Sequence, residues 1–249
     1  MNINFAGQSV LIAGAARGIG RGIVEAFAAR GANVFAGDRL SDEMAGLPAH
    51  QTQLDLLNKA ELRGWIAQSQ TLSGRSPDVL VYVAGGVLGQ SAKPLEEVDE
   101  EAWRAVLDVN LTGAFLFAQA AGREMLKRQS GCIINVASAA GLHGSVAGPH
   151  YAGYAAAKAG LMGLTRELAA SWGPKGIRVN AIAPGFFHSR LTERVAPDVE
   201  PRLKASSPLG RIGGADELKG VAVFLASEAS SYMTGQTLVV DGGVTIAGV

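Results

Sequence analysis

Tyr154 and Lys158 are the two side chains whose types and spacing point most directly to chemistry. They stand four residues apart at the start of a predicted helix, a spacing that places both on one helix face. A free tyrosine titrates near pH ~10 and is a poor base at neutral pH. A neighbouring ammonium group favours the phenolate and lowers the pKa of the phenol. The pair therefore predicts proton transfer by Tyr154, with Lys158 lowering its pKa.

Ser138 and Asn110 are two further polar residues in predicted apolar surroundings. Ser138 directly follows a predicted strand, at the sheet edge where open α/β proteins bind ligands. Its hydroxyl can hold a substrate oxygen while Tyr154 transfers the proton. Asn110 lies inside an otherwise apolar helix, where asparagine is unfavourable. A turn serine and a helix kink are the structural alternatives to a substrate contact and a polar relay.

A glycine-rich turn, with Gly14, Gly18 and Gly20, lies between the first predicted strand and the first predicted helix. Gly14 permits a sharp turn, Gly18 lets the backbone approach a pyrophosphate, and Gly20 permits close helix packing. The helix that begins around Ile19 offers free N–H groups to the phosphates. This arrangement predicts a dinucleotide site.

Asp38 predicts which dinucleotide is bound. It ends the second predicted strand, about twenty residues after the glycines, where an acid can bind a ribose 2′-hydroxyl. Arg39 and Arg17 are the opposing signals, because arginine can favour a 2′-phosphate. An aspartate at that position repels a phosphate directly, so NAD is expected and NADP is the less favoured coenzyme.

The elements that must position these residues alternate between strands and helices, which predicts a single α/β domain over residues 1–249. The fold is expected to be a Rossmann-like, doubly wound parallel sheet of about seven strands with helices on both faces. Predicted strands are 9–13, 33–37, one ending at 53–56, 79–83, 132–137, 178–183 and 237–240; predicted helices are 19–30, 100–128, 154–171 and 216–226. Residues 186–214 depart from the alternation of strands and helices, and they are interpreted as a substrate-binding lid.

Composition narrows the class of protein. Hydrophobic residues make up 48% of the 249 residues, and 22 basic residues balance 22 acidic ones, so a nucleic-acid partner is not expected. Residues 131–157 carry no charged side chain but are too rich in glycine, serine and histidine for a membrane span. The single cysteine, Cys132, and an N-terminus unlike a signal peptide favour a cytoplasmic protein. No metal site is predicted.

Taken together and in order, these motifs resemble the classical short-chain dehydrogenase/reductase family over nearly the whole chain. The motifs that carry the resemblance are the Gly14/Gly18/Gly20 turn, Asp38, Asp55-Leu56, Asn110, Ser138, Tyr154-x-x-x-Lys158, residues 180–185, residues 208–211 and Asp241-Gly242-Gly243. The resemblance implies an NAD(H)-dependent enzyme that interconverts a secondary alcohol and a ketone. It also implies a homotetramer.

The resemblance assigns roles to individual residues. Asn110, Ser138, Tyr154 and Lys158 form the implied catalytic tetrad, in which Lys158 also holds the nicotinamide ribose and Asn110 supports a water-mediated proton relay. The implied coenzyme contacts are Gly14, Arg17, Gly18, Ile19, Gly20, Asp38, Arg39, Asp55, Leu56, Ala84, Gly85, Tyr154, Lys158, Pro184, Gly185, Phe187 and Ser189.

Three departures from the family pattern bear on the site. Ala13 stands where threonine is usual, and Tyr82-Val83-Ala84-Gly85 replaces Asn-Asn-Ala-Gly, so the end of the fourth strand must be supported differently. The interval between Ser138 and Tyr154 is longer than usual, and Tyr151 occupies the normal catalytic spacing. Only Tyr154 has a lysine four residues later, so Tyr154 is assigned.

Several functions share parts of this pattern. An epimerase or dehydratase could share the glycine turn and the Tyr/Lys pair. Such enzymes usually carry a larger C-terminal substrate domain, which is not expected in this sequence. A non-catalytic nucleotide-sensing protein would be expected to lack a tetrad residue. The substrate is less determined: residues 186–188 and 208–211 resemble polyol or sugar-acid dehydrogenases, with a small cyclic alcohol as a further candidate. Reductases of 3-oxoacyl thioesters share much of the same sequence and are the alternative.

Overall fold

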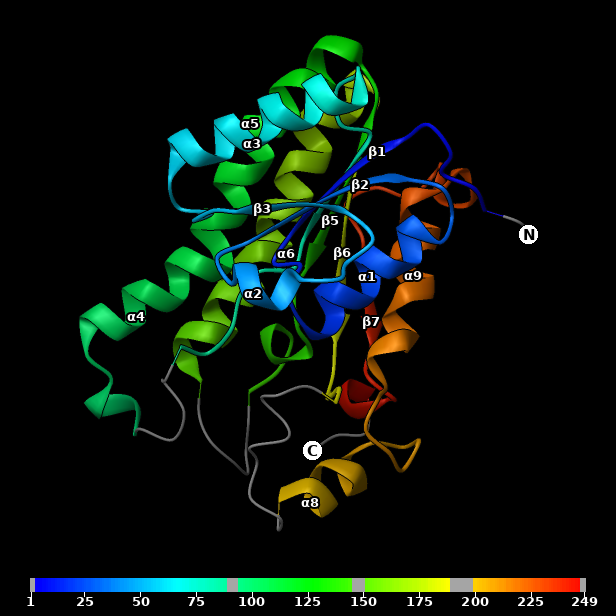
Figure 1. The fold of residues 1–249 in the computed structure, drawn as a ribbon. Coiled ribbons are helices and arrows are strands. Elements are labelled where there is room, and N and C mark those ends of the chain that lie inside the picture. Colours follow the sequence, from blue (N-terminus) through cyan, green and yellow to red (C-terminus); the bar gives the residue numbers. More distant parts are fainter. Residues whose placement is uncertain (1–2, 89–93, 145–150, 189–198, 247–249) are drawn as a thin grey trace.

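The computed structural model describes residues 3–88, 94–144, 151–188 and 199–246 (Figure 1). The strands are β1 (Ser9–Ala13), β2 (Asn33–Asp38), β3 (His50–Gln53), β4 (Val79–Tyr82), β5 (Gly131–Val136), β6 (Ile177–Pro184) and β7 (Thr237–Val240). The helices are α1 (Gly18–Ala28), α2 (Ser41–Met44), α3 (Lys59–Ser73), α4 (Glu100–Leu107), α5 (Gly113–Arg128), α6 (Ala152–Trp172), α8 (Val199–Ser206) and α9 (Lys219–Ala226).

The seven strands form one parallel sheet, as the sequence predicts. Their order is β3-β2-β1-β4-β5-β6-β7. The order reverses between β1 and β4, so the two halves of the sheet wind away from each other at that point. In such folds a crevice opens at the carboxyl ends of the strands beside the reversal. The carboxyl ends of β1, β4 and β5 lead to the glycine turn, to Ala84 and to Ser138 respectively.

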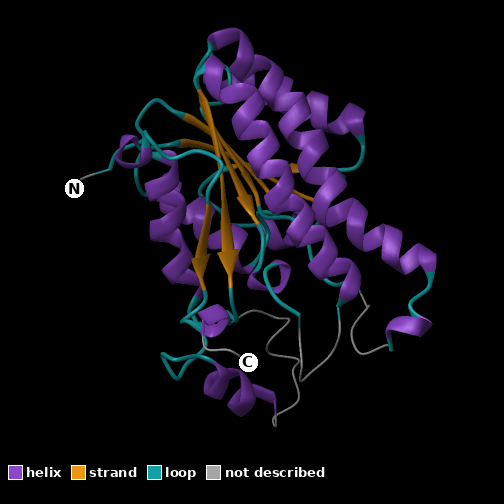
Figure 2. Cartoon of the chain, turned by 180° about the vertical axis from the view of Figure 1, so that it is seen from behind, coloured by secondary structure: helices purple, strands orange, loops and turns teal. Residues whose placement is uncertain are grey.

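Helices cover both faces of the sheet (Figures 1 and 2). Val10 and Ile12 of β1 pack with α1 and α9 on one face, whereas Leu11 and Ala13 pack with α3, α5 and α6 on the other. This division follows from the alternation of side chains along a strand. It explains why the central strands β1 and β4 are largely apolar, since every one of their positions is buried.

The structure corrects two predicted elements. The third strand ends at Gln53 and does not extend over residues 53–56, because β2 ends at Asp38, the partner of Gln53. Beyond that point, the backbone N–H of Asp55 donates to the Glu61 carboxylate instead of a strand. The long helix predicted over 100–128 is divided into α4 and α5 by a π-helical turn at Asp108–Thr112.

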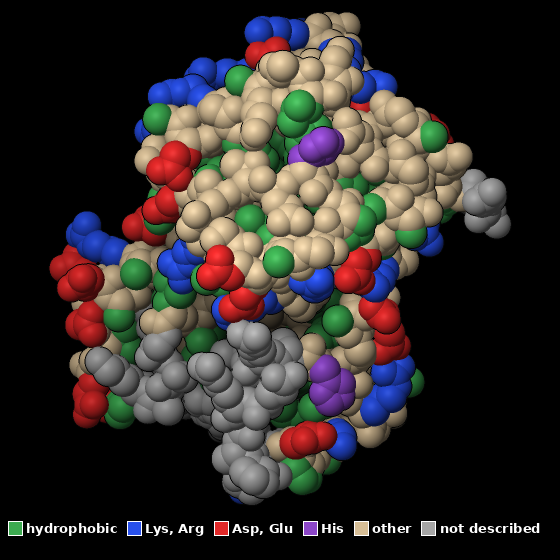
Figure 3. All heavy atoms as spheres, viewed as in Figure 1, with side chains coloured by type: hydrophobic (Ala, Val, Ile, Leu, Met, Phe, Trp, Pro, Cys, Tyr) green, Lys and Arg blue, Asp and Glu red, His purple; other side chains and the backbone are tan. Residues whose placement is uncertain are grey.

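The second crossover helix, α2, has only four residues, because the interval between β2 and β3 is short. Among the described residues, the stretch Glu100–Arg128 is long and apolar enough to cross a membrane by length and composition, and half of its apolar window is buried. Core helices of water-soluble proteins meet the same criteria. On the face shown in Figure 3, basic and acidic side chains are interspersed, in keeping with the zero formal net charge.

Candidate active site

Ser138 and Tyr154 meet at the carboxyl edge of the sheet. Ser138 follows β5, and its Oγ accepts a hydrogen bond from the N–H of Ala140 at 3.2 Å. Gly141 lets this loop lie against α6, because a Cβ at Gly141 would sit 2.7 Å from the backbone nitrogen of Ala159. The approach brings the Ser138 hydroxyl into hydrogen-bonding contact with the Tyr154 hydroxyl.

Lys158 lies one helical turn after Tyr154 and is buried, with only 2% of its surface exposed. Its Nζ donates to the backbone carbonyl of Val136 at 2.7 Å and lies 5.5 Å from the centre of the Tyr154 ring. Burial lowers the pKa of Lys158 to about 7, because the apolar surroundings disfavour its charged form.

The structure corrects the electrostatic expectation for Tyr154. Burial raises the pKa of its phenol, and the hydrogen bond with Ser138 opposes that rise without cancelling it. Lys158 does not produce the lowering that the sequence predicts, because burial disfavours its charge and its Nζ is directed to Val136. In this arrangement the tyrosine is therefore held in its protonated form.

Asn110 is fully buried in the π-helical turn between α4 and α5. Its Nδ2 donates to the carbonyls of Val106 at 2.9 Å and Gly86 at 2.8 Å, and its Oδ1 accepts from the N–H of Gly86 at 3.1 Å. A Cβ at Gly85 would overlap Oδ1 of Asn110 and lie 3.3 Å from Nζ of Lys158. The absence of a side chain at Gly85 thus brings Asn110 and Lys158 to the same part of the site.

The glycine turn has the shape that a dinucleotide needs. Gly14 has a φ of 85°, and a Cβ there would overlap the backbone of Ala84. A Cβ at Gly20 would overlap the Gly14 carbonyl, whereas the space beside Gly18 is open to 4 Å. Within the described part of the chain no side chain caps the N-terminus of α1, so its first N–H groups are available to phosphate oxygens. The residues present therefore fit a bound dinucleotide.

Asp38 lies at the end of β2, next to this turn. Its carboxylate accepts from the N–H groups of Ala16 and Leu40, each at 3.1 Å. Arg17 forms a bidentate ion pair with Glu43 of α2. Glu43 also binds Arg21, which donates to its backbone carbonyl at 3.0 Å. The side chain of Arg17 is thus directed to an acid within the protein.

Comparison with known proteins decides the family. A family model described as enoyl-(acyl carrier protein) reductase matches residues 14–245. A 3-oxoacyl-(acyl-carrier-protein) reductase of Thermotoga maritima is 38% identical, over 96% of this chain and 98% of that protein. A 2-dehydro-3-deoxy-D-gluconate 5-dehydrogenase of Bacillus subtilis is 37% identical, over 95% of this chain and 94% of that protein. A short-chain type dehydrogenase/reductase from Mycobacterium marinum has a crystal structure that matches at a TM-score of 0.92 and 35% identity, over 98% of both chains.

The chain belongs to the classical short-chain dehydrogenase/reductase family. As a member of this family it is an oxidoreductase that acts on CH–OH groups and uses a nicotinamide nucleotide. The resemblance noted in the sequence is thereby confirmed.

The other predicted coenzyme contacts of this short-chain dehydrogenase/reductase occupy different environments. Asp55 is exposed and accepts from the N–H of Leu57 at 2.9 Å, while Leu56 is buried in the core. Pro184 ends β6, and the N–H of Gly185 donates to Val240 at 2.9 Å.

Two further predicted contacts differ in exposure. The ring of Phe187 is buried against Gly213. Arg39 is exposed. Ser189 lies outside the described residues.

Tyr151 lies immediately before α6, at its N-cap position, as the sequence predicts. Burial raises the pKa of its phenol, as it does for Tyr154. Tyr154 differs from it by its contact with Ser138 and its closeness to Lys158.

Sequence reasoning missed several partners of the site residues. The Val136 carbonyl and the Gly86 backbone carry no sequence signal, because any residue supplies these groups. Glu43 has a detectable signal, an acid on a short helix after Asp38, but its pairing with Arg17 depends on how α2 folds back.

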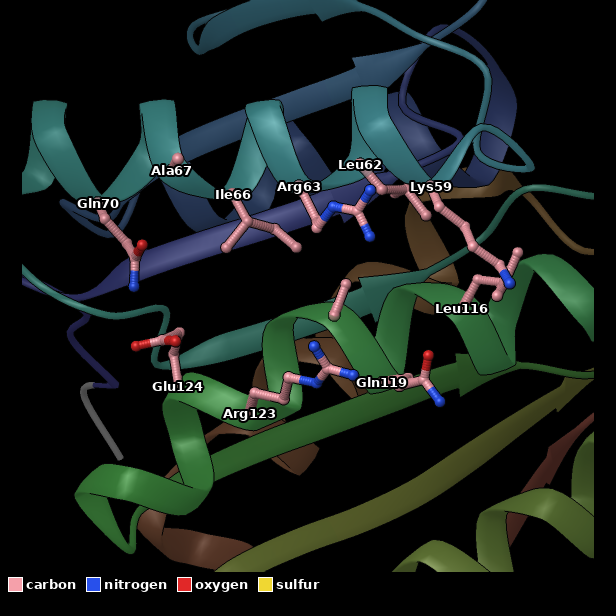
Figure 4. Close-up of a pocket in the computed structure, with 11 residues that line it drawn as sticks. Lys59, Leu62, Arg63, Ile66, Ala67, Gln70, Leu116, Gln119, Arg123 and Glu124 are labelled. Carbon is pink, nitrogen blue, oxygen red and sulfur yellow. The ribbon is translucent and has the colours of Figure 1, made fainter.

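The groove shown in Figure 4 lies between α3 and α5, away from these residues. Arg63 of α3 and Arg123 of α5 both line it. None of the predicted catalytic or coenzyme residues does, so the groove is separate from the candidate active site.

Proposed function

We propose that this protein interconverts a secondary alcohol and a ketone with NAD(H), using Tyr154 as the general acid/base. The observation that carries the proposal is the contact between the hydroxyls of Tyr154 and Ser138 at the carboxyl edge of the sheet, beside the buried Lys158. A carbonyl oxygen that replaces this contact meets two hydroxyl donors at once. Such donors stabilise the negative charge that develops on the oxygen during hydride transfer.

Each residue of the tetrad has a separate task. In the reductive direction Tyr154 gives its proton to the substrate oxygen, and in the oxidative direction it takes the proton from the alcohol. Ser138 hydrogen bonds to the same oxygen. Lys158 orients the nicotinamide ribose, and Asn110 supports the water-mediated path that returns a proton to Tyr154. The nicotinamide supplies or accepts the hydride.

The coenzyme preference is proposed to be for NAD(H). The Asp38 carboxylate lies beside the glycine turn, bonded to Ala16, where its charge opposes a 2′-phosphate. The pairing of Arg17 with Glu43 supports the same preference, because it removes a cation that could attract that phosphate. Kinetic measurements with both NAD(H) and NADP(H) test this preference directly.

For the substrate, we propose a polyol, a sugar acid or a small cyclic alcohol. The similarity to a 2-dehydro-3-deoxy-D-gluconate 5-dehydrogenase supports a sugar acid. Reduction of a 3-oxoacyl thioester is the second candidate, and the similarity to 3-oxoacyl-(acyl-carrier-protein) reductases supports it about equally. Residues 186–214 are proposed to form the substrate lid. Residues 189–198 of this segment lie outside the described part of the chain, and α8 lies beyond the carboxyl ends of the strands (Figure 1).

The proposed function is tested by following NADH and NADPH absorbance with a substrate panel. The panel holds polyols, sugar acids, small cyclic alcohols and ketones, and a 3-oxoacyl thioester. We expect turnover that Tyr154→Phe lowers by at least about a hundredfold. Coenzyme binding without turnover of any panel member would instead support a non-catalytic nucleotide-sensing protein.

A further inference from the structure

We propose that Tyr82, a buried residue outside the catalytic tetrad, is a positioning residue that fixes the π-helical turn carrying Asn110. The tyrosine stands where the family pattern has asparagine, and its hydroxyl donates to the backbone carbonyl of Val109 at 2.6 Å. This inference rests on the role proposed above for Asn110.

The place of Tyr82 in the sheet explains how a large ring fits there. It is the last residue of β4 and is only 1% exposed. Its register partner on β1 is Ala13, and both residues belong to the same core cluster on the α3–α5 face. The small Ala13, in place of the family's threonine, leaves room on this face beside the ring. The two departures in the sequence thus lie side by side in the sheet.

The ring is also fitted to the helices above it. Phe117 of α5 packs against Tyr82 with ring centres 6.2 Å apart. A Cβ at Gly113 would overlap the Tyr82 hydroxyl, so the start of α5 reaches its position only with glycine there. The hydroxyl of Tyr82 thus projects directly to the junction between the π-helical turn and α5.

The hydrogen bond to Val109 supports the irregular backbone of this junction. In an α-helix, the N–H of Gly113 would donate to Val109, four residues earlier. Here it donates to Asp108, five residues earlier, as a π-helical turn requires. The Val109 carbonyl loses its α-helical donor, and the Tyr82 hydroxyl supplies another. A buried carbonyl left without a donor is costly, so Tyr82 favours the π-helical turn over a regular helix.

The consequence falls on Asn110, the next residue along the chain. Its amide contacts with Gly86 and Val106 need the side chain to enter the site at one angle. A regular helix through 108–112 would rotate the residues that follow the turn relative to those before it. Tyr82 therefore acts on the reaction through Asn110 and does not itself touch the substrate or coenzyme site.

The test uses Tyr82→Phe, which keeps the ring and removes only the hydroxyl, in the full-length protein. We expect kcat to fall by about tenfold, since a small displacement of a positioned group is enough for such a loss. The KM for coenzyme should stay unchanged, because the glycine turn is untouched. Backbone amides of 108–114 should exchange hydrogen faster in Tyr82→Phe. Phe117→Leu is the matched control: it loosens the same core without removing the Val109 hydrogen bond, and kcat should be retained.

The decisive comparison is made in the Asn110→Ala background. If Tyr82 works through Asn110, adding Tyr82→Phe to Asn110→Ala lowers kcat no further. Equal losses in both backgrounds, or unchanged exchange over 108–114, would overturn the inference while leaving the proposed function intact. If Asn110→Ala alone keeps full kcat, the proposed role of Asn110 fails, and the inference about Tyr82 fails with it.

Discussion

Arg17 is held in a bidentate ion pair by Glu43, an acid on the four-residue helix α2. Asp38 ends β2 nearby, and its carboxylate accepts from the N–H of Ala16 in the glycine turn. We expect this environment to favour a ribose hydroxyl over a phosphate, because Asp38 carries a repelling charge and the charge of Arg17 is neutralised by Glu43.

Coenzyme choice follows from this arrangement. The protein should use NADH with a kcat/KM at least about tenfold above that for NADPH, which corresponds to about 1.4 kcal/mol. Asp38→Ser should erode the preference because it removes the repelling charge nearest the ribose. Glu43→Gln should raise the affinity for NADP(H) by releasing Arg17, and Arg17→Ala should cancel that gain. Steady-state kinetics and titration with both coenzymes measure these effects. Equal or better efficiency of the unmodified protein with NADPH would refute the assignment and direct attention to Arg39.

Lys158 should make the stability of the protein depend on pH. Its pKa is about 7 in the folded protein and about 10.5 when unfolded, so between these values the unfolded chain binds more protons. The free energy of unfolding should therefore rise with pH from about 7 upward, by up to about 1.4 kcal/mol per pH unit from this group. Below pH ~7 both states are protonated and this contribution to the slope disappears.

Urea denaturation of the unmodified protein and of Lys158→Met at pH 7 and pH 9 measures this dependence. As pH rises from 7 to 9, the unfolding free energy of the unmodified protein should increase relative to that of Lys158→Met. A constant difference would show that the lysine keeps its ordinary pKa despite its burial.

Assembly into a homotetramer is expected from the family. The exposed stripe of α5 contains Phe115, which is 43% exposed, and Val239 on the edge strand β7 is 41% exposed. Both are apolar groups suited to contact another copy of the chain. Sedimentation should show a tetramer at micromolar concentration, and Phe115→Glu should shift it to smaller species. If the unmodified protein sediments only as a monomer, the expectation of a tetramer is wrong.

The fold was predictable because short β-branched runs alternate with amphipathic stretches along the whole chain. The convergence of Ser138 and Tyr154 was predictable as well, since a residue that follows a parallel strand lies at the ligand-binding edge. The irregular turn at Asn110 was anticipated only as a helix kink, and its π-helical form was not, because an apolar pattern of helical length conceals one inserted residue. The raised pKa of Tyr154 depends on burial, which only the packed structure reveals.

Tyr82 shows the same limit in another form. The sequence shows that Tyr82 departs from the family pattern. It does not show what supports the end of β4 in place of the usual asparagine. The answer needs the register of β4 with β1 and the position of Val109 above them. Backbone carbonyls such as those of Val109 and Val136 carry no signature in the sequence.

The central claim, that Tyr154 and not Tyr151 transfers the proton, is tested most directly by single-turnover kinetics across pH on Tyr154→Phe and Tyr151→Phe. Tyr154→Phe should slow hydride transfer by at least about a hundredfold, because it removes the general acid/base. Tyr151→Phe should leave the chemical step largely intact, since Tyr151 precedes α6 and has no lysine four residues later. Coenzyme binding should survive both changes. If Tyr151→Phe abolishes hydride transfer while Tyr154→Phe retains it, Tyr151 is the general acid/base and the assignment of Tyr154 is wrong.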